Sequence, residues 1–218
     1  MGSPGKGLQL HKIKNSRKDT KLPGIRKPLA PPRLCGIKKN KMKLKKNDKA
    51  IVFKTLDILG KKIDLEALQG KKVLLSFYRG ASCPFCNLRV HEVINQMDHF
   101  HKKGLVVIGV FMSDKHEIME FVGKQNPPFP IIADPDEKYY KMYGLEKSFA
   151  GKMKAMLRFG ALMKIFAKGY FSMKSMKDEN TLPGDFLINE NGNIEIAYYG
   201  KDFGDHLDFK TINNWINT

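Results

Sequence analysis

The chain has 218 residues, of which 42% are hydrophobic, and it carries a formal net charge of +17 at pH 7. That length and apolar content suffice for one hydrophobic core of ordinary size. No apolar run approaches the length of a membrane-spanning helix, and three cysteines are too few for a disulfide framework. These features argue against an integral membrane protein and a small disulfide-stapled domain, and we expect a cytoplasmic, reducing compartment.

The positive charge is concentrated near the N-terminus. Residues 1–41 hold twelve of the 39 Lys and Arg residues and one of the 22 Asp and Glu residues, so they carry +11 and the rest carries +6. This segment is rich in Pro and Lys and lacks periodic apolar positions, so we predict a disordered basic tail over 1–46 and a folded domain over 47–218. The tail is open to several interpretations: nucleic-acid contact, membrane contact, a targeting segment, or residues preceding a true start at Met42.

The remaining chain alternates between patterns typical of strands and of helices. The first half is predicted to contain a hairpin over 50–56 and 63–65, a central strand over 72–77, a helix over 84–101 and a strand over 105–111. A helix over 113–122, with Ser113 as its cap, a short strand over 129–133 and a helix over 136–142 follow. The last part is predicted to form a hairpin over 185–189 and 194–199 and a closing helix over 206–216. Gly60 and the pair Asn191-Gly192 are the turn residues of the two hairpins. This alternation indicates a sheet with parallel members and right-handed crossovers.

A Met-rich segment over 148–176 interrupts this rhythm. It has no Asp or Glu between Lys147 and Lys177, and we predict one or two helices, broken at Gly160 and Gly169. The favoured interpretation is a helical insertion that packs on the sheet. Two alternatives are a mobile lid or adaptable binding surface near the thiols, since methionine repacks easily, and contact with a membrane surface.

The most informative feature is the junction between the central strand and its helix, where Cys83 and Cys86 flank Pro84 and Phe85. The unpaired N–H groups and the dipole of a helix N-terminus favour thiolate over thiol. Pro84 suits the first helical position, which makes Cys83 the N-cap and the more exposed thiol, with Cys86 one turn further and more buried. This spacing lets the two sulfurs form a disulfide with little backbone movement, so the pair predicts a redox site.

Zinc binding and an inert buried pair are the competing interpretations of these cysteines. A closed zinc site needs four ligands, and the remaining cysteine, Cys35, lies in the basic tail, with His91 the nearest imidazole. We therefore expect no metal and no organic cofactor, and we assign catalysis to no histidine. A polar turn follows the last strand, and its favoured role is structural, with Asp205 capping the closing helix.

Four strings carry a resemblance to a known family: TLDILGKKIDL (55–65), FYRGASCPFCNLRVHEV (77–93), LPGDFLINENGNI (182–194) and YYGKDFGDH (198–206). They resemble the peroxiredoxin-like branch of the alkyl hydroperoxide reductase/thiol-specific antioxidant (AhpC/TSA) family over about residues 47–218. The resemblance implies an α/β, thioredoxin-like fold with a central mixed sheet flanked by helices, an N-terminal hairpin and a helical insertion. It also implies a peroxide-reducing antioxidant enzyme that needs an external thiol reductant, such as a thioredoxin or glutathione system.

The resemblance assigns roles to several residues. The family's peroxide-attacking cysteine follows a Thr or Ser three residues earlier and is partnered by an Arg, so Cys86 takes the attacking position and Cys83 replaces the hydroxyl residue. Arg79 replaces the family's proline, and the usual later arginine has no evident counterpart near Pro183. Arg79 is therefore a candidate substitute for that arginine. Pro84 and Pro183 are possible supporting residues. In folds of this type, a proline at the place of Pro183 is often cis and faces the thiols.

Two mechanisms then use the same two sulfurs. In the peroxidase, Cys86 attacks the peroxide, becomes a sulfenic acid and condenses with Cys83. In a thioredoxin-like disulfide reductase, Cys83 attacks a protein disulfide and Cys86 resolves the mixed disulfide. A third alternative is a catalytically silent adaptor that binds acidic partners through the basic insertion or the tail.

Overall fold

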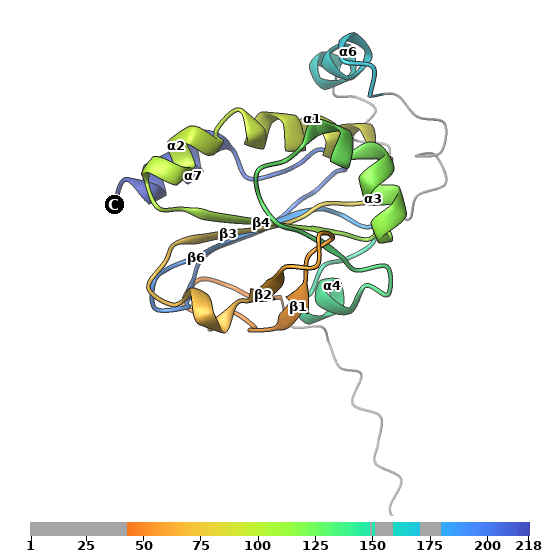
Figure 1. Cartoon of the computed structure of the whole chain (residues 1–218). Helices are drawn as coiled ribbons and strands as arrows, with labels where there is room; N and C mark the ends of the chain where they lie inside the picture. The colour runs from red at the N-terminus through yellow and green to blue at the C-terminus, as the bar shows by residue number, and fades with distance from the viewer. Residues whose placement is uncertain (1–42, 149, 151–158, 171–179) are drawn as a thin grey trace, which may run out of the picture. The chain divides into compact units, whose positions relative to one another are not determined.

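A computed structural model of the chain describes residues 43–148, 150, 159–170 and 180–218. Five strands form one mixed sheet in the order β5-β4-β3-β6-β7, and β1 and β2 form a separate hairpin (Figure 1). The strands are β1 Lys54–Leu56, β2 Lys62–Asp64, β3 Val73–Phe77, β4 Val106–Phe111, β5 Ile131–Ala133, β6 Gly184–Ile188 and β7 Ile194–Tyr199. The predicted α/β architecture with a central mixed sheet is confirmed, while residues 1–42 of the predicted tail lie outside the described residues.

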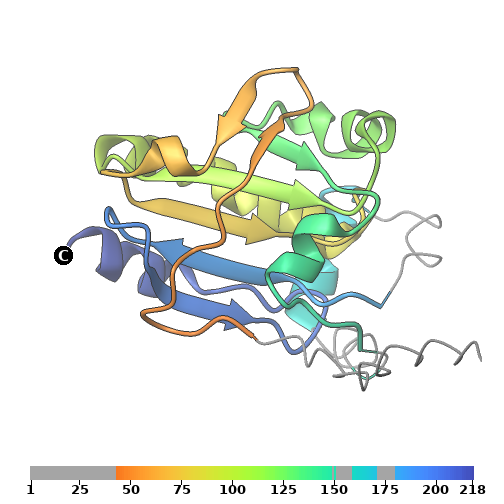
Figure 2. The same ribbon diagram turned by 90° about the horizontal axis from the view of Figure 1, so that it is seen from below.

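The strand β3 is the centre of the sheet, as its apolar sequence predicts. It runs parallel to β4 and antiparallel to β6, and all five of its residues are buried. Figure 2 shows these strands side by side, with β5 and β7 at the two edges of the sheet. A strand that is buried on both faces has a nearly continuous apolar sequence, which is why residues 72–77 predict a central strand.

Helices cover one face of the sheet, and a helix with the hairpin covers the other (Figure 1). The helices are α1 Pro84–Ile94, α2 Met97–Lys102, α3 Lys115–Phe121, α4 Lys138–Met142, α6 Phe159–Ala167 and α7 Phe209–Ile216, with short 3-10 helices η1 Glu66–Leu68 and η2 Gly123–Gln125. Side chains alternate along β3, so Leu74 joins the core beneath α1, α2, α3 and α7, while Leu75 and Phe77 join the core beneath α4 and the hairpin. The two cysteines belong to the first of these cores.

Both predicted hairpins form, and the first strand, β1, is shorter than expected. Gly60 and Gly192 take left-handed backbone conformations, with φ of 86° and 74°. The first strand begins at Lys54 rather than Ala50, because the preceding residues run along the β6–β7 turn: the Ala50 N–H donates to the Gly192 carbonyl at 3.0 Å.

Several helix boundaries differ from the prediction. The helix predicted over 84–101 is two helices, α1 and α2, separated at Asn95 and Gln96, where the chain tightens and the Gln96 N–H donates to the Val93 carbonyl. The cap of α3 is Asp114, whose carboxylate accepts from the Glu117 N–H at 2.8 Å, and not Ser113. Asparagine is a weak helix former, which suits the break between α1 and α2. The Ser113 hydroxyl accepts the Ala81 N–H instead of capping α3.

The closing helix α7 starts at Phe209 rather than His206. Its cap is Asp208, whose carboxylate accepts from the Thr211 N–H at 2.8 Å, so the predicted capping role of Asp205 is wrong. The residues just before the cap are held in an extended connection, because the Leu207 N–H donates to the Asp185 carboxylate at 2.7 Å.

The described part of the insertion is α6. Gly160 is the second residue of α6, and residues 151–158 lie outside the described ones, so the predicted break at Gly160 stays a prediction; Gly169, with φ of 68°, follows the end of the helix. The helix packs against α1 rather than on the sheet, with Ile165 buried. The rest of the segment predicted over 148–176 lies largely outside the described residues. Among the helices of the described part, none is long and apolar enough to cross a membrane.

Candidate redox site

The two cysteines lie at the N-terminus of α1, directly after the loop that leaves β3. Cys83 is the N-cap, with φ −66° and ψ 120°, and Pro84 is the first helical residue, as predicted. The Cys83 carbonyl accepts the Asn87 N–H at 3.0 Å, which is the first hydrogen bond of the helix. Both thiols are free and fully buried, so the expectation that Cys83 is partly exposed is wrong.

Arg79 contacts both sulfurs from the loop between β3 and α1. Its Nη1 donates to the Cys83 Sγ at 3.1 Å, and its backbone N–H donates to the Cys86 Sγ at 3.3 Å. The guanidinium is 3% exposed: its Nε donates to the Thr181 carbonyl at 2.9 Å, and it lies 3.4 Å from the Phe203 ring centroid. The structure therefore brings the candidate Arg79 to the thiol pair, with its position set by the segments before β6 and after β7.

These contacts separate the pKa values of the two thiols. Burial alone would raise the pKa of Cys83, but the hydrogen bond with Cys86 and the charge of Arg79 outweigh it and lower the pKa to about 5. Burial raises the pKa of Cys86 well above its usual range, and the neighbouring Cys83 sulfur adds to that effect. The opposite directions of the two shifts make Cys83 the more acidic thiol of the pair.

Side-chain hydrogen bonds hold the loop that carries the cysteines. The Asn87 amide donates to the carbonyls of Ala81 at 2.7 Å and Cys83 at 3.0 Å, and Gln125 donates to the Asn87 side chain at 3.1 Å. The Ala81 N–H donates to the Ser113 hydroxyl at 2.8 Å. The predicted capping residue Ser113 thus anchors the thiol loop to the end of β4 instead.

Pro183 lies in the segment that leads into β6. No peptide bond among the described residues is cis, so the bond before Pro183 is trans. Its carbonyl accepts the Gly200 N–H at 2.9 Å, which ties this segment to the end of β7. Thr181, two residues earlier, supplies the carbonyl that holds Arg79.

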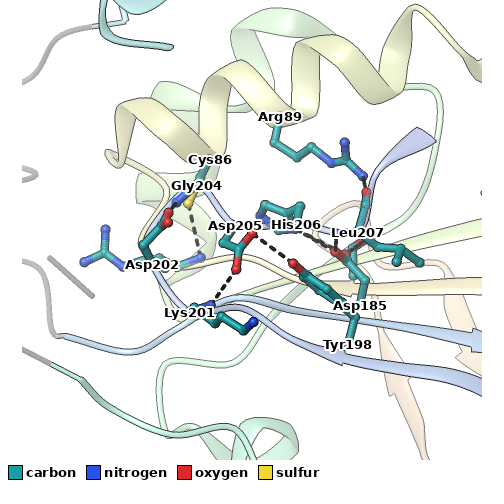
Figure 3. A network of polar contacts seen from close by, with 12 residues as sticks. Cys86, Arg89, Asp185, Tyr198, Lys201, Asp202, Gly204, Asp205, His206 and Leu207 are labelled. Atoms are coloured by element: carbon teal, nitrogen blue, oxygen red, sulfur yellow. Dashed lines mark hydrogen bonds and ion pairs between the residues drawn. The ribbon is translucent and has the colours of Figure 1, made fainter. Parts of the chain in front are cut away.

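A second polar network lies beneath the same helix, centred on Asp185 (Figure 3). This fully buried carboxylate accepts from the Ser76 hydroxyl at 2.6 Å, the Leu207 N–H at 2.7 Å and the His206 Nδ1 at 3.0 Å. Burial alone would raise the pKa of Asp185, but the His206 imidazole, the Arg89 charge and the Ser76 hydroxyl lower it to about 2. The carboxylate is therefore ionised and fixed inside the core.

The polar turn after β7, residues 201–206, makes mostly contacts within its own part of the fold, which agrees with the structural role favoured for it. Asp205 accepts from the Tyr198 hydroxyl at 2.9 Å and the Lys201 N–H at 2.8 Å, and the Gly204 N–H donates to Asp202 at 2.9 Å (Figure 3). Two residues of this turn nevertheless reach the site, because Phe203 packs on Arg79 and His206 binds Asp185.

Sequence reasoning missed the Asp185 network, although a signal for it was available. Ser76 and Asp185 interrupt two apolar strands at positions that alternate with core residues, and they are register partners across β3 and β6. A polar pair at inward strand positions is expected to find hydrogen-bond partners in the core. Phe203 carried no comparable signal.

A metal centre was a competing interpretation of the two cysteines. No group of three or more His, Cys, Asp or Glu side chains in that part of the chain is placed to hold a metal ion. His91, the imidazole considered for such a site, instead lies 2.9 Å from the Lys168 Nζ.

A mixed sheet flanked by helices, with a CxxC pair where the central strand meets a helix, defines a protein of thioredoxin-like fold. Residues 47–197 match the model of the AhpC/TSA family, so the chain belongs to that family, in its peroxiredoxin-like branch. Peroxiredoxin Bcp of Escherichia coli strain K12 is 32% identical over 111 residues, which cover 50% of this chain and 71% of that relative.

Two solved structures share the fold. Peroxidoxin BcpB from Mycobacterium tuberculosis aligns with a TM-score of 0.57 at 14% identity, covering 80% of this chain and 95% of that chain. A cysteine-to-serine mutant of the peroxiredoxin 6 of Arenicola marina aligns with a TM-score of 0.61 at 15% identity, covering 80% and 72%. The fold expected from the sequence is therefore confirmed.

Proposed function

We propose that the protein is a thiol-dependent antioxidant enzyme that reduces peroxides through Cys83 and Cys86. The observation that carries the proposal is the buried pair itself, in which Arg79 lies 3.1 Å from one sulfur and a second thiol lies one helical turn away. The family supplies the substrate class, because the matched relatives are named peroxiredoxins. This pair can be oxidised by two electrons without a metal or an organic cofactor.

The charges favour Cys83 as the attacking sulfur. Its thiolate attacks one peroxide oxygen, the O–O bond breaks, and the sulfur is oxidised by two electrons to a sulfenic acid while the second oxygen leaves as an alkoxide or hydroxide and takes a proton. The Cys86 thiol then condenses with the sulfenic acid, which forms the Cys83–Cys86 disulfide and releases water. An external thiol system, such as thioredoxin or glutathione, returns two electrons and two protons.

Arg79 has two roles in this scheme. Its guanidinium lowers the pKa of Cys83, so that the nucleophile is present at neutral pH. The same cation lies where negative charge develops on the leaving oxygen, and a fixed cation in a buried site stabilises such charge strongly.

The test uses the reduced protein carrying Cys35→Ser, so that only the two core thiols remain. One equivalent of hydrogen peroxide should remove both thiols and give an intramolecular disulfide by mass spectrometry. With Cys86→Ser added, the reaction should stop at a sulfenic acid on Cys83, which dimedone traps, and with Cys83→Ser added it should be slow. A trapped Cys86 in the Cys83→Ser protein, with rapid reaction, would restore the order of attack that the family resemblance implies.

Disulfide reduction is the second candidate, and one observation favours it. The N-terminal cysteine of the pair is the one with the lowered pKa, as thiol–disulfide exchange at a helix N-terminus requires. Insulin reduction by the same variants tests it: turnover with insulin but none with peroxide selects the reductase. Activity in neither assay would leave the adaptor that binds acidic partners.

We further propose that the enzyme works in a reducing compartment, the cytoplasm, with an external thiol reductant. The proposal rests on the need for that reductant and on the sparing use of cysteine in the chain. Coupling the purified protein to NADPH oxidation through a thioredoxin system, and separately through a glutathione system, identifies the electron donor.

A further inference from the structure

Thr181 carries a buried hydroxyl group that lacks a hydrogen bond. The residue is 2% exposed, and its Oγ1 has no hydrogen-bond partner among the described residues. Burying a hydroxyl without a hydrogen bond costs about 1 to 3 kcal/mol, so most buried hydroxyl groups in proteins have one. A threonine that keeps this cost beside a reactive site is accounted for by a ligand that accepts its hydrogen bond only while it is bound.

Thr181 also lines a cavity of about 470 Å³, which is bounded by α4 and the residues that follow this helix. Tyr140, Leu145 and Thr181 form the buried part of its wall. Glu137 and Lys147 belong to the wall as well and form an ion pair at 2.7 Å. A cavity of this volume lies in the range of pockets that take small molecules, so it is large enough for a hydroperoxide.

The wall of this cavity is hydrogen-bonded to the groups that surround the thiols. The Arg79 guanidinium donates from Nε to the Thr181 carbonyl at 2.9 Å and from Nη1 to the Cys83 Sγ at 3.1 Å. The Tyr140 hydroxyl donates to the carbonyl of Tyr78, the residue before Arg79, at 2.6 Å. One guanidinium group therefore links Thr181 to the Cys83 sulfur, which puts this end of the cavity beside the redox site.

We propose that the peroxide enters through this cavity and that the Thr181 hydroxyl donates a hydrogen bond to its leaving oxygen. The inference rests on the proposed peroxidase and adds a residue to it, because the family resemblance puts its hydroxyl residue at the position of Cys83. The Cys83 thiolate bonds to one oxygen and becomes a sulfenic acid, and the O–O bond breaks. The other oxygen leaves with the electron pair and takes a proton from water. A donor fixed where that charge develops accelerates the step, and Thr181 keeps its own proton.

The test compares Thr181→Val and Thr181→Ser with the parent chain, all in the reduced Cys35→Ser protein. Valine keeps the shape of the side chain without the hydroxyl, so the second-order rate constant for thiol oxidation by hydrogen peroxide should fall at least about tenfold. Serine keeps the hydroxyl and should retain most of the rate. Alkylation by iodoacetamide, which has no O–O bond, should proceed at the same rate and with the same pH midpoint in all three proteins, because the carbonyl at position 181 still binds Arg79.

Urea unfolding separates this role from a structural one. Because the hydroxyl has no partner, Thr181→Val should be at least as stable as the parent chain, whereas a threonine that held the fold together would lose stability on this change. Thr55→Val, in the β1–β2 hairpin, is the matched control and should leave the peroxide rate unchanged.

A second variant tests the route. Lys141 is an exposed residue of the cavity wall, and Lys141→Trp places a bulky side chain there. This variant should slow the reaction with cumene hydroperoxide more than the reaction with hydrogen peroxide. Rates with both peroxides that equal those of the parent chain would remove the cavity from the route and overturn the proposal.

Two results with Thr181→Val would also overturn it. Reaction with peroxide as fast as in the parent chain would leave the hydroxyl to an ordered water. An equal loss of rate with peroxide and with iodoacetamide would mean that the change acts on Cys83 itself. A parent chain that peroxide does not oxidise would instead refute the peroxidase, and with it this role for Thr181.

Discussion

Arg79 is the side chain on which the charge state of the thiol pair depends. It replaces a proline of the family pattern, and it reaches the Cys83 sulfur through Nη1 and the Cys86 sulfur through its backbone N–H. A buried cation needs a compensating charge, and the Cys83 thiolate supplies it. We propose that Arg79 serves at the thiols in place of the arginine that the family resemblance would put near Pro183.

Arg79→Met should raise the pKa of Cys83, because the cation that stabilises the thiolate is lost while burial remains. The midpoint of iodoacetamide alkylation against pH should move up by about 1 to 2 pH units. Arg89→Met is the matched control: Arg89 is also buried and lies 3.9 Å from the Phe209 ring centroid, with its Nη2 donating to the Leu207 carbonyl. A midpoint that moves equally in both variants would contradict the role given to Arg79.

Asp185 contributes to stability through its lowered pKa. The folded-state pKa is about 2, below the ordinary value of 3.8, so the stabilisation is present above about pH 4 and is lost as the pH falls toward 2. Asp185→Asn should therefore lower the free energy of unfolding at neutral pH by about 2 kcal/mol or more. Urea unfolding at several pH values checks the sign: the gap between wild type and variant should shrink below pH 4, and a constant gap would contradict it.

The connection between β7 and α7 is the element that completes the site. It carries Phe203, which covers Arg79, and His206, which binds Asp185. Its start is packed too closely for any side chain at Gly200: an added Cβ would collide with the Asp205 carbonyl and lie 3.0 Å from the Pro183 carbonyl. Backbone atoms cannot move aside singly, so glycine is required there for steric reasons.

Gly200→Ala should destabilise the protein by about 2 kcal/mol or more, because the whole connection must shift. It should also slow the reaction of Cys83 with peroxide, since Phe203 and His206 move with the connection. Gly160→Ala is the control: a Cβ at Gly160 meets nothing within 4 Å, and the change should stabilise α6 by up to about 1 kcal/mol. Urea unfolding and stopped-flow peroxide reduction measure the two effects; equal stability of the two variants would contradict the steric argument.

The redox state should change the stability of the molecule as a whole. In the reduced protein, the pKa of Cys83 is about 5 when folded and near its ordinary value of 9.0 when unfolded. A depressed pKa contributes stability that is complete above pH 9 and is lost as the pH falls through about 5. Oxidation removes this thiolate and the stabilisation that it contributes, while a disulfide that closes so short a loop stabilises the folded state by about 2 kcal/mol at any pH, through its restraint of the unfolded chain.

The free energy of unfolding of the reduced form, relative to that of the oxidised form, should therefore rise by about 2 kcal/mol between pH 5 and pH 7. Urea unfolding of both forms at several pH values measures this change. Stabilisation of the reduced form by the thiolate also raises the reduction potential of the Cys83–Cys86 disulfide. We expect this potential to lie above that of thioredoxin, which is about −270 mV, so that a thioredoxin system can reduce the disulfide. The Cys83→Ser/Cys86→Ser protein should not respond to oxidant, and a difference between the two forms that stays constant between pH 5 and pH 7 would contradict the charge assignment.

Local patterns in the sequence were enough to predict the strands of the sheet and the position of the two thiols at the start of a helix. The run 72–77, the turns at Gly60 and Gly192, and Pro84 at the first position of α1 all depend on near neighbours along the chain. Such features are decided within a few residues, so periodicity, turn residues and caps predict them. The spacing of Cys83 and Cys86 belongs to the same class of information.

The tertiary structure alone decided the environment of those thiols. The bond from Arg79 to Thr181 spans 102 residues, and the one from Ser76 to Asp185 spans 109. Contacts of this length bury Cys83, which an isolated helix N-terminus would leave exposed, and they hold the Arg79 guanidinium against its sulfur. Burial and charge depend on every segment that packs around a group, and such partners are adjacent only after the chain has folded.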